Sequence, residues 1–244
     1  MKYGILGDIH SNLSALEAVL AEMSKEGIDR YIQVGDLVGY GADPIAVIDR
    51  VLELKPIVVC GNHDLASIQR LDIQYFNNYA REAILWTRKM LPRKYVQFIA
   101  GLNLVETEAD VTVVHGTLYR PEEFDYIQTT IDARNTIDLM KTRLCFVGHS
   151  HIPVAFLQKA DEPDKIAYTF DYEIELNGWS KVLVNVGSIG QPRDENPKAA
   201  YAVYDTEQEK VWIRRVAYDI DKEAAKILKA GLPRVLADRL KLGV

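Results

Sequence analysis

An α/β fold is predicted for this sequence because segments with strand character alternate with segments whose apolar residues recur at helical spacing. The predicted strands cover 3–6, 31–34 and 57–60, and the segments between them, 13–23 and 44–52, are predicted helices. Elements in this order require right-handed crossovers, which predicts a parallel sheet covered on both faces. Each strand also ends in a polar or glycine turn, at the edge where ligands bind in such sheets.

Local signals mark the ends of the first two helices. Asn12 is a typical capping residue before the first helix, and Gly27 follows its end. Asp43 and Pro44 are typical of the N-cap and first position of the second helix, which Pro56 ends. We therefore expect two short amphipathic helices with defined boundaries.

The alternation pauses between residues 65 and 104. Within this segment, large apolar residues recur at the spacing of an amphipathic helix: Tyr75, Tyr79, Ala83, Trp86 and Met90. We predict a helical insertion at about 65–104, whose helix ends at Pro92. An aromatic stripe is typical of a packed core, and we favour that interpretation over a platform for substrate.

The second half of the chain predicts more strands. Strands at 111–114 and 144–147 flank a helix at 131–141. After Pro153, predicted strands follow one another without helices: 154–157, 168–176, 181–186, 200–204 and 211–216. We expect these five to form a second sheet packed on the first. A terminal helix begins at 221, and because no repeat or linker interrupts the chain we predict one domain over 1–244.

The composition predicts a globular protein with a packed core, because 48% of the residues are apolar. The net charge of −6 argues against a stable nucleic-acid complex, which needs a basic surface. No apolar run approaches the roughly 18 residues of a membrane span, and the N-terminus does not resemble a signal peptide, so we predict no membrane association and a cytoplasmic location. Cys60 and Cys145 each end or continue an apolar run, and we expect buried, reduced thiols.

All five histidines lie within four residues of the end of an apolar strand run. They are His10, His63, His115, His149 and His151. Four oxygen-bearing side chains reach the same positions: Asp8, Asp36, Asn62 and Asp64. Because ligands gather outside the carboxyl ends of strands in α/β sheets, we expect these residues to converge.

Oxygen and imidazole ligands without thiolate suit Mn²⁺, Zn²⁺, Ni²⁺ or Fe. The number of candidate ligands is too high for one ion, so the sequence predicts two divalent transition-metal ions, with Mn²⁺ favoured. Two ions about 3.5–4 Å apart can activate a water and clamp a phosphoryl group. The predicted reaction is hydrolysis of a phosphate ester.

Five motifs occur in order along residues 1–200: Asp8-x-His10, Gly35-Asp36, Gly61-Asn62-His63-Asp64, His115-Gly116 and Gly148-His149-Ser150-His151. Together they resemble the calcineurin-like metallophosphoesterase family. The resemblance implies a four-layer α/β/β/α sandwich of two packed mixed sheets with a dinuclear metal centre and a metal-bridging hydroxide as nucleophile.

The resemblance also implies a role for each motif residue. One metal would be held by Asp8, His10 and His151, the other by Asn62, His115 and His149, with Asp36 bridging the two. His63 matches the family's catalytic histidine, which is not a ligand and protonates the leaving oxygen or steadies the transition state. Asp64 is expected to act as a local hydrogen-bond partner.

The chain departs from the phosphoprotein phosphatase branch of the family. That branch continues its second motif with Asp-Arg-Gly, where this chain has Gly39-Tyr40-Gly41, so protein dephosphorylation is disfavoured. The segment from Asn185 to Arg193 resembles instead the small prokaryotic branch described as phosphodiesterases. We expect Asn62 and Arg193 to contact the substrate, with a surface salt bridge as the alternative for Arg193.

The leading hypothesis is therefore a phosphodiesterase acting on a small or nucleotide-like diester. A phosphomonoesterase or dinucleoside polyphosphate hydrolase is the alternative. A hypothesis of another class is a non-catalytic scaffold, as in the retromer subunit that resembles this family but lacks the acid histidine. The presence of His63 favours the enzyme, and the sequence predicts no oligomeric state.

Overall fold

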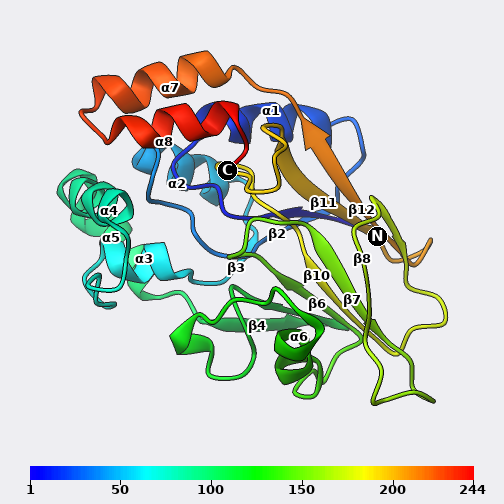
Figure 1. The fold of residues 1–244 in the computed structure, drawn as a ribbon. Helices are drawn as coiled ribbons and strands as arrows, with labels where there is room; N and C mark the ends of the chain where they lie inside the picture. The colour runs from blue at the N-terminus through cyan, green and yellow to red at the C-terminus, as the bar shows by residue number, and fades with distance from the viewer.

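The computed structural model describes residues 1–244 and contains two six-stranded mixed sheets that pack face to face. Helices α1 (Leu13–Met23) and α2 (Pro44–Glu53) cover the outer face of the first sheet, and α6 (Thr130–Ile137) covers the second (Figure 1). This arrangement confirms the predicted four-layer α/β/β/α sandwich. No helix combines the length and apolar character needed to cross a membrane.

The first sheet has the order β3-β2-β1-β11-β12-β9. Its strands are β1 (Lys2–Leu6), β2 (Arg30–Gln33), β3 (Ile57–Val58), β9 (Glu173–Glu175), β11 (Ala199–Asp205) and β12 (Lys210–Val216). β1, β2 and β3 pair in parallel, as the strand–helix alternation predicts, whereas β11 pairs antiparallel with β1. The second face of this sheet is covered by the other sheet and not by helices.

The second sheet has the order β4-β5-β6-β10-β7-β8. Its strands are β4 (Val105–Glu108), β5 (Val111–Val114), β6 (Leu144–Val147), β7 (Val154–Gln158), β8 (Ala167–Thr169) and β10 (Lys181–Asn185). β5, β6 and β10 are parallel neighbours, so their carboxyl ends meet at one edge. β4 was not predicted.

The prediction that the five strands after Pro153 form a sheet of their own is wrong. β11 and β12 join the first sheet, and β7, β8 and β10 join the second. The predicted strand 168–176 is also two strands in different sheets, because Asp171 forms a turn in which its carboxylate accepts a hydrogen bond from the Thr169 hydroxyl at 2.7 Å. Alternating apolar residues indicate which face of a strand is buried, but they do not identify its partner.

The two sides of β1 show how the layers are joined. Ile5 faces the cluster between the sheets, where it packs with side chains such as Phe146 and Val184, and the next residue, Leu6, faces the cluster beneath α1 and α2. Both side chains have no exposed surface. Alternate side chains of the strand therefore pack into two separate cores.

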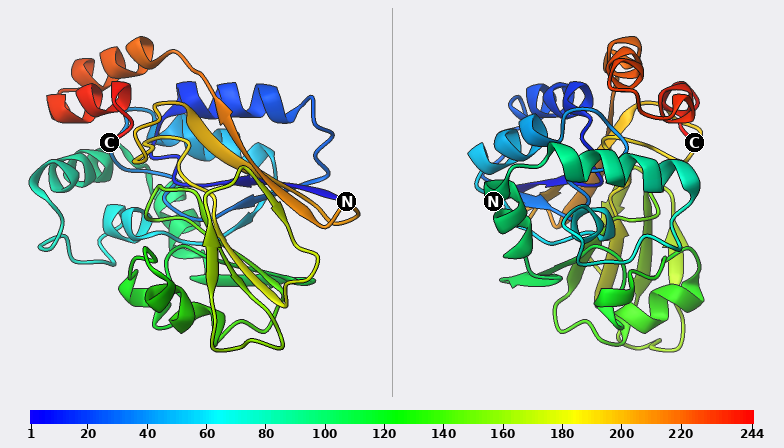
Figure 2. Two further views of the ribbon diagram at one scale, coloured as in Figure 1. Left: turned by 45° about the vertical axis from the view of Figure 1, so that its right-hand side comes forward. Right: turned by 90° about the vertical axis from the view of Figure 1, so that its left-hand side faces the viewer.

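The predicted insertion contains α3 (Asn62–Ser67), α4 (Asn78–Met90) and α5 (Arg93–Ala100). Ala83 and Trp86 pack against the C-terminal helices α7 (Ile220–Lys229) and α8 (Arg234–Asp238), which lie on the same side of the molecule as α1 (Figure 2). The core assignment is wrong for Tyr75, which precedes α4 and is 89% exposed, and for Met90, which ends α4 and is 42% exposed.

Cys60 and Cys145 are buried free thiols, as expected. The Asn12 side chain caps α1 by accepting a hydrogen bond from the Ala15 N–H at 2.9 Å. Asp43 precedes α2 but makes no capping bond, because its carboxylate pairs with Lys226 of α7.

Candidate metal centre

The predicted metal ligands come from the carboxyl ends of strands in both sheets. Those after β1 and β2 meet those after β5 and β6 in two groups that share Asp36. One group is Asp8, His10, Asp36 and His151, the other is Asp36, His115 and His149, and the ligand atoms within each lie within 4.8 Å of one another. The site therefore lies where the edges of two packed sheets meet, and not at one open sheet.

Main-chain carbonyls orient three of the histidines. The Nδ1–H groups of His10, His115 and His151 donate to the carbonyls of Val38 at 3.0 Å, Val34 at 2.8 Å and Gln191 at 2.6 Å, respectively. Because a carbonyl oxygen only accepts, Nδ1 carries the proton in each ring and Nε2 is free to bind a metal.

The resulting lone pairs face one another. Nε2 of His10 lies 3.1 Å from Nε2 of His151, and each lies within 3.5 Å of a carboxylate oxygen, of Asp36 and Asp8 respectively. Two imidazole lone pairs and two carboxylates converging in a buried space are mutually repulsive unless a cation lies between them. The donor set of this first group therefore fits a divalent metal.

The second group repeats this chemistry. His115 Nε2 lies 3.1 Å from His149 Nδ1, 3.1 Å from Asn62 Oδ1 and 3.3 Å from Asp36 Oδ2. All four atoms can donate a lone pair, and Asn62 adds an oxygen without adding charge. The structure thus brings together all seven predicted ligands, with Asp36 between the two groups.

The pKa values of the cluster also indicate a site that favours positive charge. Burial holds the pKa of His10, His149 and His151 well below the usual value, so these rings are neutral near pH 7 and able to bind a metal. Burial also lowers the pKa of His115, but the charges of Asp36 and Asp8 outweigh it and raise the value to about 9. A cation at this position is stabilised by the two carboxylates.

Asp64 is a structural residue of the third motif, Gly61-Asn62-His63-Asp64. Its carboxylate accepts hydrogen bonds from the N–H groups of Asp36 at 2.9 Å, Leu37 at 3.0 Å and Gly61 at 3.0 Å, and it belongs to neither ligand group. It therefore joins the turn after β2 to the start of α3. A Cβ on Gly61 would lie 2.1 Å from Asp36 Oδ1, so only glycine allows this close approach.

His63 lies beside the ligands but belongs to neither group. Its main-chain N–H donates to Asp36 Oδ1 at 2.9 Å. Its ring packs against those of His10, Tyr40 and Phe76, with centroids 4.7, 4.5 and 5.1 Å away. No side chain bonds to Nδ1, which is buried without a partner. Packing, and not a hydrogen bond to a carboxylate, therefore holds the ring.

The protonation state of His63 follows from this environment. Burial lowers the pKa of His63 to about 4, so the ring is neutral near pH 7. Because an N–H buried without an acceptor is costly, the single ring proton is more stable at Nε2 than at Nδ1. A neutral His63 can therefore donate one hydrogen bond to a substrate oxygen.

Arg193 follows β10 and forms no ion pair, so the predicted alternative of a surface salt bridge is wrong. Its Nη2 group donates to the Tyr40 hydroxyl at 3.3 Å and to Gln191 Oε1 at 3.2 Å. Its positive charge contributes to the low pKa of His151. Arg193 is thus a cation near the ligands without a carboxylate of its own.

Asn185, at the end of β10, is a buried residue to which sequence reasoning gave no role. Its amide donates to the Gly148 carbonyl and, at 3.0 Å, to the Ser150 hydroxyl, and it accepts from Gly187 N–H at 3.0 Å. These bonds join the His149–His151 loop to the loop that carries Arg193. The signals in the sequence are an amide side chain at the end of an apolar strand and its place at the start of the Asn185–Arg193 segment.

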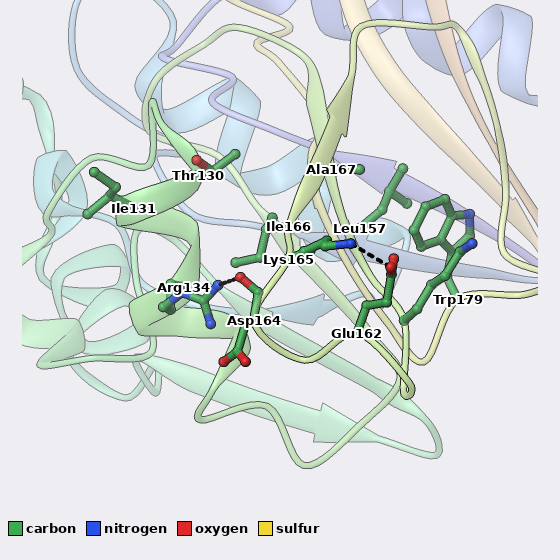
Figure 3. Close-up of a pocket in the computed structure, with 11 residues that line it drawn as sticks. Thr130, Ile131, Arg134, Leu157, Glu162, Asp164, Lys165, Ile166, Ala167 and Trp179 are labelled. Atoms are coloured by element: carbon green, nitrogen blue, oxygen red, sulfur yellow. Dashed lines mark hydrogen bonds and ion pairs between the residues drawn. The ribbon is translucent and has the colours of Figure 1, made fainter.

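A cavity of about 440 Å³ opens beside the ligands and is bordered by Asn62, His63 and His149. A larger cavity of about 630 Å³ lies near β7 and α6, where Arg134 and Trp179 form part of its wall (Figure 3). The larger cavity contains none of the predicted site residues, and its charged groups bond within it, as Lys165 does with Glu162 at 2.7 Å. The smaller cavity is therefore the candidate substrate site.

Known proteins share this sequence and fold. The family model of the calcineurin-like phosphoesterase superfamily domain matches residues 1–209. An uncharacterised protein of Methanocaldococcus jannaschii is 38% identical over 245 residues, which cover 98% of this chain and 97% of that protein.

Solved structures extend the similarity. A metallophosphoesterase from Sphaerobacter thermophilus has a TM-score of 0.88 at 36% identity, covering 100% of this chain and 99% of that one. A hypothetical protein from Pyrococcus horikoshii OT3 shares the fold with a TM-score of 0.80 at 21% identity, covering 100% and 98%. With most of the chain matched by the family model and an Asp/His cluster able to bind a divalent metal, the chain belongs to the calcineurin-like phosphoesterase superfamily.

Proposed function

We propose that this protein is a dinuclear metal-dependent phosphodiesterase that hydrolyses a small or nucleotide-like diester. The observation that supports this most directly is the pair of ligand groups sharing Asp36, in which fixed imidazole lone pairs face buried carboxylates. A pair of divalent ions held there, with Mn²⁺ favoured, would supply an activated water and a clamp for the phosphoryl oxygens.

The side chains around the ligands have distinct roles in this proposal. His63 donates its Nε2–H to the leaving oxygen, where negative charge develops as the ester bond breaks. Arg193, which lacks a carboxylate partner, binds a non-bridging phosphoryl oxygen, and Asn62 contributes its amide to the same substrate. The buried His63 in the cavity wall favours an enzyme over a scaffold, which has no need for an unpaired imidazole there.

The preference for diesters rests on the small number of cations near the ligands. A monoester dianion carries one more charged oxygen than a diester, and the phosphoprotein-type arginine that would bind it is replaced by the Gly39-Tyr40-Gly41 segment. Arg193 is hydrogen-bonded to Tyr40, whose ring packs against those of His10 and His63. A single cation matches the single charge of a diester.

A substrate panel tests the proposal. Bis-nitrophenyl phosphate, nitrophenyl phosphate and a dinucleoside polyphosphate are assayed with Mn²⁺, Ni²⁺, Zn²⁺ and Fe²⁺, and His149→Ala is the matched inactive control. We expect the highest kcat/KM for the diester. A higher kcat/KM for the monoester or polyphosphate with every metal would overturn the diester assignment. Absence of hydrolysis with every metal would overturn the proposal that the protein is an enzyme.

A further inference from the structure

The cavity beside His63 has aromatic walls. Five aromatic side chains line it: Tyr40, Tyr75, Phe76, Phe124 and Tyr126. Tyr126 stacks on the His149 ring with centroids 4.0 Å apart and planes at 14°, and Tyr75 is 89% exposed with no hydrogen bond or aromatic partner of its own. Its volume of about 440 Å³ lies in the roughly 300–1,000 Å³ range of small-molecule sites.

The charged residues of this cavity are all acidic. Asp72, Glu122 and Glu123 line it, and no lysine or arginine does. Glu123 is paired with Arg120, but neither Asp72 nor Glu122 takes part in an ion pair. An anionic group placed here would be repelled, whereas an uncharged group with amino hydrogens would find acceptors.

We propose that this cavity receives the leaving group of the substrate, and that this group is an uncharged alcohol that carries a planar aromatic ring, such as a nucleoside. The inference rests on the proposed function, because it uses His63 to define the leaving side. A group held between Tyr75, Phe76 and Tyr126 lies next to the imidazole that donates to the leaving oxygen. Stacking on aromatic faces selects planar rings, and the carboxylates exclude phosphate-bearing ones.

This assignment separates the leading hypothesis from one of its alternatives. Hydrolysis of a dinucleoside polyphosphate releases nucleotides that carry several negative charges. The Asp72 and Glu122 carboxylates would oppose such a product in this cavity. An ester of a nucleoside hydroxyl instead releases an uncharged alcohol, which the cavity accommodates.

Direct binding tests the cavity without requiring turnover. Adenosine and ADP are titrated calorimetrically into chelator-treated protein, where no metal can bind the phosphates of ADP. We expect adenosine to bind more tightly than ADP, and Tyr75→Ala to weaken adenosine binding about tenfold, within the range of base stacking. Tyr172→Ala is the matched control, because Tyr172 is 55% exposed but lies outside the cavity. The proposal would be overturned if adenosine did not bind, if Tyr75→Ala bound adenosine as tightly as the unaltered protein, or if ADP bound more tightly than adenosine.

Charge reversal gives a second, kinetic test. The double variant Asp72→Lys/Glu122→Lys is compared with Asp161→Lys, which changes an exposed carboxylate outside the cavity. The substrates are a methyl diester of adenosine and its counterpart with an extra phosphate on the leaving nucleoside. We expect the double variant to shift the ratio of kcat/KM about tenfold toward the charged leaving group, and Asp161→Lys to leave it unchanged. An unchanged ratio in the double variant would contradict the role of the carboxylates.

The two proposals fail in different ways. Hydrolysis of bis-nitrophenyl phosphate and metal content are measured on the same preparations. Hydrolysis without adenosine binding would remove the leaving-group assignment and retain the phosphodiesterase. Adenosine binding without hydrolysis or metal uptake would remove the phosphodiesterase and show a nucleoside site of another kind.

Discussion

Replacing Gly39 by alanine should displace His63, the proposed catalytic histidine, without touching the proposed metal ligands. Gly39 has a φ of +91°, and a Cβ at this position would lie 2.5 Å from His63 Nδ1, where ordinary contacts begin at 3.4 Å. To restore an ordinary contact, the imidazole would move by about 0.9 Å. A displacement of about 1 Å costs roughly 10² in rate, so we expect Gly39→Ala to lose about 100-fold in kcat/KM on alkyl diesters.

Gly178→Ala is the matched control for this experiment. Gly178 has a φ of +85°, and a Cβ there would meet nothing within 4 Å. Both substitutions place an alanine in the left-handed region, which costs about 1–2 kcal/mol, so both should lower the melting temperature. Gly39→Ala should lower it further, because its Cβ also meets a buried ring. Only Gly39→Ala should lose activity while retaining metal by elemental analysis. Full activity in Gly39→Ala, or equal loss in Gly178→Ala, would refute the reasoning.

Four further predictions follow from the site. Asp36→Ala should empty both metal positions in elemental analysis, because its carboxylate belongs to both groups, and retention of one ion would show that it does not bridge. His63→Ala should keep its metal and lose about 10²–10⁴-fold in turnover, with larger losses on alkyl than on nitrophenyl esters; equal losses would place His63 against a non-leaving oxygen. Asn185→Ala should weaken metal affinity about 10–100-fold, because it frees the loop of His149, and unchanged affinity in calorimetry would remove this positioning role. Chelation should lower the melting temperature by about 5–10 °C, since ligand at 100 times its Kd adds about 2.7 kcal/mol and each kcal/mol shifts a chain of this size by about 2–4 °C; an unchanged melting temperature would argue against tight binding.

The sequence predicts the fold class and the site residues better than it predicts the sheets. Asp8, Asp36 and His115 each follow a strand that an apolar run identifies, so their positions at strand ends could be inferred. The pairing of β11 with β1 could not, because an alternating strand fits any partner that covers its apolar face. The convergence of the ligands was thus expected, because the carboxyl ends of parallel strands meet at one edge of a sheet. That reasoning placed the site at the edge of one sheet, whereas the structure forms it from the edges of two.

Tyr75 shows a different limit of the sequence pattern. Its spacing from Tyr79 and Ala83 fits one helical face, but Asn77 caps α4 by accepting a hydrogen bond from Ala80 N–H at 2.9 Å, so the helix begins after Tyr75. The capping signal was present in the sequence and outweighs the periodicity. One turn of difference moves an aromatic ring from the core to the wall of the cavity.

The backbone at the ligands explains why their geometry could not be read from residue types. Five of the seven ligands have positive φ although none is glycine: Asp8, His10, Asp36, His149 and His151, with φ between 43° and 69°. Such conformations cost about 1–3 kcal/mol each and persist only where surrounding bonds fix them.

Those bonds run between the ligand loops themselves. The His10 N–H donates to the Asp36 carbonyl at 3.0 Å, the His149 N–H donates to Asp8 Oδ1 at 3.0 Å, and the Ser188 hydroxyl donates to the Asp8 carbonyl at 2.8 Å. Each strained turn is therefore fixed by a turn from another strand, and in two cases from the other sheet. Because the ligands brace one another before any metal binds, the folded chain itself supplies the strain and the preorganisation that the metal centre requires.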